Sequence, residues 1–82
     1  MLTIYTKDYC PYCIKAKHLL TSLGATYEEV DITQSPEIIV DLVKKSGMRT
    51  VPQIFFWEEC LGGYDNIAKL HEEWELLEKL WL

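Results

Sequence analysis

The tetrapeptide Cys-Pro-Tyr-Cys at residues 10–13 constrains the fold more than any other stretch of this chain. It follows "LTIYT" (residues 2–6), where apolar residues alternate with hydroxyl or phenolic ones as in a strand. Pro11 has no N–H to lose, and its fixed φ suits the first position of a helix. We therefore expect Cys10 at or just before a helix N-terminus and Cys13 one turn inside it.

Extended and helical patterns alternate along the rest of the chain. They predict, in order, a strand at 2–6, a helix at 12–23 ended by Gly24, a strand at 26–32, a helix from Pro36 to Gly47 with Ser35 as its N-cap, strands at 52–57 and 60–63, and a last helix opened by Asp65. This βαβ-α-ββ-α order predicts an α/β chain with a thioredoxin-like fold, in which helices flank a four-stranded mixed sheet.

The last predicted helix carries an apolar stripe that runs nearly to residue 82. Its members keep a 3-4-3-4 spacing and are Ile67, Leu70, Trp74, Leu77 and Trp81. We expect the stripe to complete the core and the acidic face to be solvated. A partner-binding or dimerising face is the alternative, because an exposed apolar stripe marks an interface.

Length and charge limit the classes of function. A chain of 82 residues predicts one domain over 1–82, and its net charge of -5 argues against nucleic-acid binding, which needs clustered Lys and Arg. The charge is uneven, since residues 1–50 carry six acidic and six basic side chains and residues 51–82 carry seven and two. No apolar run approaches the roughly 18 residues of a membrane helix. The start lacks the features of a secretory signal, so we expect a cytoplasmic protein without a membrane partner.

The position of the cysteine pair predicts its chemistry. Unpaired N–H groups and the positive end of the helix dipole favour a thiolate at Cys10, and Lys7 adds positive charge. A thiolate is the nucleophile of disulfide exchange, so Cys10 is predicted to attack and Cys13 to resolve the resulting mixed disulfide. A zinc site would want further paired ligands, whereas His18, Cys60 and His71 are scattered singly.

Three separated motifs carry a family resemblance: "YTKDYCPYC" (5–13), "TVPQIF" (50–55) and "GGYDN" (62–66). In this order they make the chain resemble the glutaredoxin family, specifically its small dithiol members of bacterial or phage type. The resemblance implies a glutathione-dependent oxidoreductase that reduces protein disulfides and glutathione mixed disulfides through a redox-active Cys10–Cys13 disulfide. It implies no metal and no tightly bound cofactor, because glutathione serves as reductant and co-substrate.

The resemblance also implies a binding site for glutathione. Its glycyl carboxylate would pair with Lys7 and Arg49, and its α-ammonium with Asp65. Pro52 would be cis and lie beside Cys10, whereas the sequence alone favours an ordinary strand-opening proline. The residues implied to contact the tripeptide are Lys7, Tyr12, Arg49, Thr50, Val51, Pro52, Gly63, Tyr64, Asp65 and Asn66.

Three positions depart from the family pattern. Asn66 stands where many relatives carry a second Asp, the turn at 58–59 lacks a common glycine, and Cys60 is an odd thiol that we expect to act as a small hydrophobe. Two other functions stay open: a redoxin reduced by thioredoxin reductase, and a carrier in which two protomers and two glutathiones hold a [2Fe–2S] cluster through Cys10. The expected protein is a monomer that acts on disulfide-bonded or glutathionylated proteins, with ribonucleotide reductase a candidate at family level.

Overall fold

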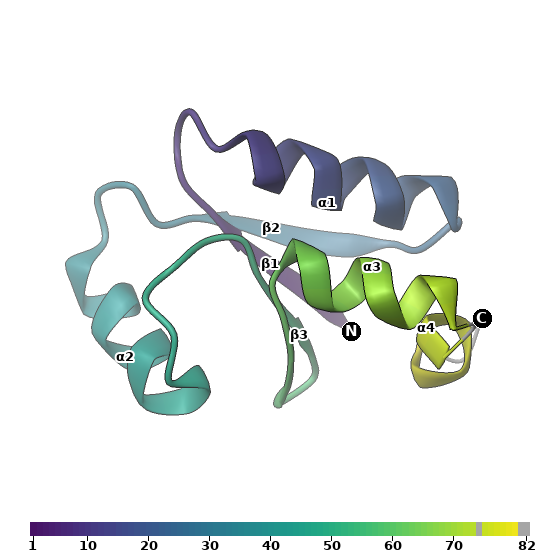
Figure 1. The fold of residues 1–82 in the computed structure, drawn as a ribbon. Helices are drawn as coiled ribbons and strands as arrows, with labels where there is room; N and C mark the ends of the chain where they lie inside the picture. Colours follow the sequence, from purple (N-terminus) through teal and green to yellow (C-terminus); the bar gives the residue numbers. More distant parts are fainter. Residues whose placement is uncertain (74, 81–82) are drawn as a thin grey trace.

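The computed structural model describes residues 1–73 and 75–80 of the chain. Its helices and strands follow the predicted order as far as the second hairpin strand (Figure 1). They are β1 (Leu2–Thr6), α1 (Pro11–Ser22), β2 (Tyr27–Asp31), α2 (Pro36–Ser46), β3 (Gln53–Phe56), β4 (Glu59–Gly62), α3 (Tyr64–Glu72) and α4 (Glu75–Lys79). No helix in the described ranges has the length and hydropathy to cross a bilayer.

The four strands form one mixed sheet in the order β2-β1-β3-β4. β1 and β2 are parallel because α1 carries the chain back between them, whereas β3 is antiparallel to both β1 and β4. This confirms the predicted thioredoxin-like arrangement, in which the first βα turn lies at one end of the central strands.

Helices cover both faces of the sheet (Figure 1). Leu2 and Ile4 of β1 point into a larger core that contains residues of α1, α3 and α4. Tyr5, the next residue along, packs in a smaller core with Leu42 of α2 and Phe55 of β3. The alternation of the strand thus sends successive side chains into opposite cores, which fixes the register of β1.

The prediction of one terminal helix opened by Asp65 is wrong. Gly63 is the N-cap, α3 ends at Glu72, and the separate helix α4 begins at Glu75. On one continuous helix Leu76, nine residues after Ile67, would lie on roughly the opposite face. The break allows Leu76 and Leu80 to join Ile67 in the larger core.

Part of the predicted stripe is not placed. Trp74 and Trp81 lie outside the described residues, so the two explanations offered for them stay predictions. Ile67 is fully buried and Leu70 packs against the core, as the stripe predicted.

The hairpin between β3 and β4 turns without a glycine. Trp57 takes the left-handed conformation that such a turn requires, with φ of 56°. Its backbone N–H donates to the Met1 carbonyl at 2.9 Å, and its side chain is 67% exposed. Cys60, on β4, packs against the smaller core, in agreement with its predicted role as a small hydrophobe.

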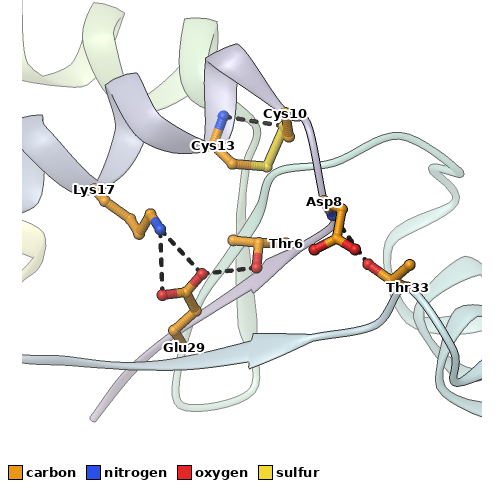
Figure 2. Close-up of polar contacts among 7 residues, drawn as sticks. All are labelled: Thr6, Asp8, Cys10, Cys13, Lys17, Glu29 and Thr33. Atoms are coloured by element: carbon orange, nitrogen blue, oxygen red, sulfur yellow. Dashed lines mark hydrogen bonds and ion pairs between the residues drawn. A yellow bond between two sulfur atoms is a disulfide. The ribbon is translucent and has the colours of Figure 1, made fainter.

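A polar network ties α1 to the sheet below the cysteine pair (Figure 2). The hydroxyl of Thr6, which is 3% exposed, donates to Glu29 Oε2 at 2.9 Å. Lys17 Nζ of α1 lies 3.1 Å from the same carboxylate oxygen. Glu29 therefore gives the buried hydroxyl its acceptor and holds α1 against β2.

Replacing Glu29 by Ala should lower the free energy of unfolding by about 1–2 kcal/mol, because the buried Thr6 hydroxyl loses its acceptor. Urea denaturation measures the change. Glu28→Ala is the matched control, since the adjacent Glu28 has no ion-pair partner among the described residues and its loss should stay within about 0.5 kcal/mol. Equal losses for the two variants would contradict the role given to Glu29.

Candidate redox site

Cys10 and Cys13 are joined by a disulfide at the start of α1 (Figure 2). Cys10 is the N-cap, with φ of -111° and ψ of 96°, and Pro11 is the first helical residue, as predicted. The Cys13 N–H donates to Cys10 Sγ at 3.1 Å. Cys10 is half-buried, whereas Cys13 is only 2% exposed. The two sulfurs are therefore unequal: one lies at the surface end of a helix and accepts a hydrogen bond, and the other lies in its first turn.

A second loop meets the disulfide from the other side of the site. The Val51–Pro52 peptide is cis, and the Val51 carbonyl oxygen lies 3.8 Å from Cys10 Sγ. A disulfide sulfur has no proton to donate, so in this oxidised state the contact is one of proximity. The implication that Pro52 follows a cis peptide bond is confirmed, and the Val51 carbonyl of that peptide is the group that lies beside Cys10. The alternative of an ordinary strand-opening proline is wrong.

The loop before Cys10 is attached to the segment that follows β2. The backbone N–H of Asp8 donates to the Thr33 hydroxyl at 3.0 Å (Figure 2). The Thr33 N–H in turn donates to Asp31 Oδ1 at 2.8 Å. Hydrogen bonds from the side chain and then the backbone of Thr33 hold the pKa of the Asp31 carboxyl below its ordinary value. These contacts fix the approach of the chain to α1.

A cavity of about 190 Å³ opens beside the disulfide loop. It gathers most of the residues that the sequence implied for glutathione, although they come from three distant segments. Its lining consists of Tyr12, Met48, Thr50, Val51, Pro52, Gly63, Tyr64, Asp65 and Asn66. Met48 is the member that sequence reasoning missed. Lys7 and Arg49 do not line this cavity but a neighbouring hollow against α2.

Tyr12 forms one wall of the cavity. Its side chain is 54% exposed, and its ring centroid lies 6.1 Å from that of Tyr64 at the start of α3. Lys15 Nζ lies 5.1 Å from the centroid of the Tyr12 ring, within the range of a cation–π contact. The wall is thus aromatic, with a cation at its outer edge.

The opposite wall is the turn from β4 into α3. Gly62 has φ of 101°, and a Cβ there would come within 2.6 Å of the Asn66 side chain. Gly63 has an ordinary φ, but a Cβ on it would lie 3.3 Å from the Pro52 carbonyl oxygen. Gly62 is therefore required by its positive φ, and Gly63 allows the close approach of the Pro52 backbone. Asn66 Oδ1 accepts the Gly63 N–H at 3.0 Å, so Asn66 caps the start of α3.

Gln53 positions the third side of the cavity. This side chain is 2% exposed, and its Nε2 donates to the carbonyl oxygens of Met48 and Thr50, each at 3.0 Å. One buried amide thus anchors the segment that precedes the cis proline. Sequence reasoning missed this role, although a lone polar residue inside the apolar run "PQIFFW" was a signal for it.

The described part of the chain has no group of three or more His, Cys, Asp or Glu residues arranged to bind a metal ion. The chemistry that the geometry offers is the making and breaking of one sulfur–sulfur bond at the mouth of a cavity. On a thioredoxin-like fold, this defines a thiol–disulfide oxidoreductase.

Comparison with known proteins narrows this class of oxidoreductase to one family. A family model described as Glutaredoxin matches residues 2–61. The chain is 40% identical over 75 residues to a glutaredoxin of Pseudomonas aeruginosa, covering 92% of this chain and 89% of the relative. It is 43% identical over 67 residues to glutaredoxin 3 of Escherichia coli K12, covering 82% and 81%. A crystal structure of a buckwheat glutaredoxin–glutathione complex superposes with a TM-score of 0.91 at 33% identity, covering 96% of this chain and 74% of that one.

The chain therefore belongs to the glutaredoxin family. It is a glutathione-dependent thiol–disulfide oxidoreductase that works through the Cys10/Cys13 pair, and its family uses glutathione as the reductant.

Replacing Gln53 by Leu should release the segment that contains Met48 and Thr50, because their carbonyls lose a buried donor. Hydrogen–deuterium exchange should rise at residues 48–51 more than in β1, and the free energy of unfolding should fall by about 1–3 kcal/mol. Gln34→Leu, at an exposed position, is the matched control. Unchanged exchange at 48–51 in Gln53→Leu would show that the amide does not hold this segment.

Proposed function

We propose that Cys10 is the attacking residue and Cys13 the resolving residue of this oxidoreductase. The observation that carries the assignment is the inequality of the two sulfurs: Cys10 Sγ accepts the Cys13 N–H and is half-buried, while Cys13 is 2% exposed. On reduction, the same N–H and the helix N-terminus stabilise a thiolate at Cys10. A substrate disulfide can reach this sulfur without unfolding of α1.

The reaction proceeds by four successive thiol–disulfide exchanges. The Cys10 thiolate attacks a sulfur of the substrate disulfide, and the other substrate sulfur leaves as a thiolate that takes up a proton. Cys13 then attacks Cys10 Sγ, which releases the second substrate thiol and forms the Cys10–Cys13 disulfide. One glutathione thiolate then attacks Cys10 Sγ and releases Cys13 as a thiolate. A second attacks the glutathione sulfur of the resulting mixed disulfide, which releases the Cys10 thiolate and forms glutathione disulfide.

We place glutathione in the cavity between Tyr12 and the start of α3. A peptide-like ligand can pair with the backbone of Thr50 and Val51 beside the cis proline, in the manner of an added strand. The exposed carboxylate of Asp65 suits the α-ammonium, and the N–H groups of the first turn of α3 suit the neighbouring carboxylate. Pro52, Gly63, Tyr64 and Asn66 complete this contact set.

The glycyl end of glutathione would leave the cavity toward Lys7 and Arg49. Both side chains line the adjoining hollow, which begins next to the Thr50–Val51 segment. Neither forms an ion pair with another described residue, so both charges are available to a carboxylate. This arrangement supports the predicted pairing and separates the two ends of the tripeptide.

The wider setting is also a proposal. The chain acts as one domain and as a monomer in the cytoplasm, without a tightly bound cofactor or a nucleic-acid or membrane partner. Its substrates are disulfide-bonded or glutathionylated proteins, among which ribonucleotide reductase is a candidate by family resemblance. The acidic balance of residues 51–82 supports the exclusion of nucleic acid.

Substitution of each cysteine tests the assignment of roles. Cys10→Ser should abolish turnover of a small glutathione mixed disulfide, with a loss of at least about a thousandfold in kcat/KM, because no other residue supplies the attacking sulfur. Cys13→Ser should retain this activity and lose the reduction of protein disulfides. The assay couples glutathione disulfide formation to glutathione reductase, and Cys60→Ser is the matched control. Retained activity in Cys10→Ser would overturn the proposal.

The same assay separates the reductants. Replacing glutathione and its reductase by thioredoxin reductase should leave turnover near background. Turnover with thioredoxin reductase alone would favour the alternative of a redoxin reduced by that enzyme. No described contact favours the [2Fe–2S] carrier.

A further inference from the structure

A second hollow beside the redox site is explained only in part by the proposed glutathione contacts. It has a volume of about 490 Å³ and is formed by α2 and the two loops that approach the disulfide. We call it the basic α2 surface, and its residues are Lys7, Ile39, Val40, Val43, Lys44 and Arg49. Lys7 lies three residues before Cys10, and Arg49 lies two residues before Val51, whose carbonyl oxygen is 3.8 Å from Cys10 Sγ. Two residues of this surface therefore belong to the loops that carry Cys10 and Val51.

The floor of this surface is apolar. Val40 is 55% exposed, and Ile39 lies beside it with its inner side packed against the smaller core. Val43, one turn after Ile39, continues the same floor. Exposed branched side chains on a helix that faces a reaction site are suited to cover an apolar side chain of a bound molecule.

The rim of this surface is cationic. Of the eight basic residues in the chain, Lys17, Lys45 and Lys79 form ion pairs, and Lys15 lies over the ring of Tyr12. Three of the remaining four, Lys7, Lys44 and Arg49, meet on this surface. None of them has an acidic partner within the described residues, and no acidic residue lines the hollow. Asp41, the nearest acid along α2, pairs with Lys45 at 3.1 Å.

Glutathione cannot account for the whole of this surface. Its glycyl end offers one carboxylate, for which the proposed function uses Lys7 and Arg49. Lys44 and the three aliphatic residues of α2 lie beyond that contact and find no counterpart in the tripeptide. A ligand that fills the surface must carry more than one negative charge and an apolar side chain between them.

We infer that the basic α2 surface docks an acidic and apolar segment of the substrate protein, of the form carboxylate, aliphatic or aromatic side chain, carboxylate, next to the disulfide that Cys10 attacks. The inference deepens the proposed function, on which it rests, by naming the class of protein substrate. Charge complementarity at the rim and burial of one apolar side chain on Val40 provide the recognition. The acidic and apolar segment determines which proteins bind, and the steps of disulfide exchange stay as in the proposed function.

Two disulfide-bearing peptides that differ only in the flanking segment test this inference, Glu-Leu-Glu in one and Lys-Leu-Lys in the other. Wild-type protein should reduce the acidic peptide about tenfold faster in kcat/KM at low salt, and 0.5 M salt should remove most of the preference. The net charge of -5 would by itself favour the basic peptide, so this result requires the local surface. Equal rates, or a preference for the basic peptide, would overturn the inference.

A charge-reversal variant tests whether the preference for the acidic peptide arises at the basic α2 surface. Lys44→Glu should lower the preference for the acidic peptide about fivefold or more and leave turnover of a small glutathione mixed disulfide unchanged. Lys69→Glu, the matched control on α3, changes the net charge equally and should leave the preference intact. An equal effect of both variants would mean that only the overall charge of the protein acts, and would overturn the inference.

Replacing Val40 by Ser tests the apolar floor. The variant should slow reduction of the Glu-Leu-Glu peptide and leave the rate for a Glu-Ser-Glu version unchanged. Equal slowing of both peptides would contradict the apolar floor.

Two further measurements separate this inference from failure of the proposed function and from self-association of the protein. Wild-type protein that fails on the small mixed disulfide contradicts the proposed function and the inference with it, whereas normal turnover without peptide discrimination contradicts the inference alone. Sedimentation velocity should show monomers for both wild type and Lys44→Glu. A wild-type dimer that Lys44→Glu dissociates would assign the surface to the acidic half of a second copy and overturn the inference.

Discussion

The hydrogen bond from the Cys13 N–H to Cys10 Sγ links the fold to the chemistry of this protein. It exists because Cys10 occupies the N-cap of α1, where the first N–H groups of the helix have no backbone acceptors. Pro11 sets this position, and the packing of Ala16 and Leu20 in the larger core holds the helix in place. Two cysteines close in sequence thereby differ in exposure and hydrogen bonding, and this difference allows one to attack and the other to resolve.

The remainder of the site is built around that sulfur by segments far away in sequence. The cis Val51–Pro52 peptide faces Cys10, and the buried amide of Gln53 holds the preceding segment from within the sheet. The turn into α3 closes the cavity because Gly63 approaches the Pro52 carbonyl closely. A separate hollow against α2 is lined by Lys7, Lys44 and Arg49, which have no ion-pair partner among the described residues. A protein that is acidic overall thus carries a basic surface beside its main cavity.

Local signals in the sequence predicted most of the fold and the placement of the cysteine pair at the start of α1. Pro11, Pro36 and the glycines at 24 and 47 mark helix ends through their own backbone preferences, and these predictions were confirmed. The break between α3 and α4 was not predictable, because it depends on Leu76 and Leu80 reaching a core formed by distant strands. The anchoring by Gln53 and the separation of Lys7 and Arg49 from the main cavity likewise arise from tertiary contacts that no single stretch encodes.

We propose that the helix N-terminus makes Cys10 the sulfur that reacts first. Reduced wild-type protein, mixed rapidly with glutathione disulfide, quenched with acid and mapped by mass spectrometry, tests this directly. The earliest glutathione adduct should lie on Cys10 and decay as the Cys10–Cys13 disulfide forms. An adduct that appears first on Cys13 or Cys60 would contradict it.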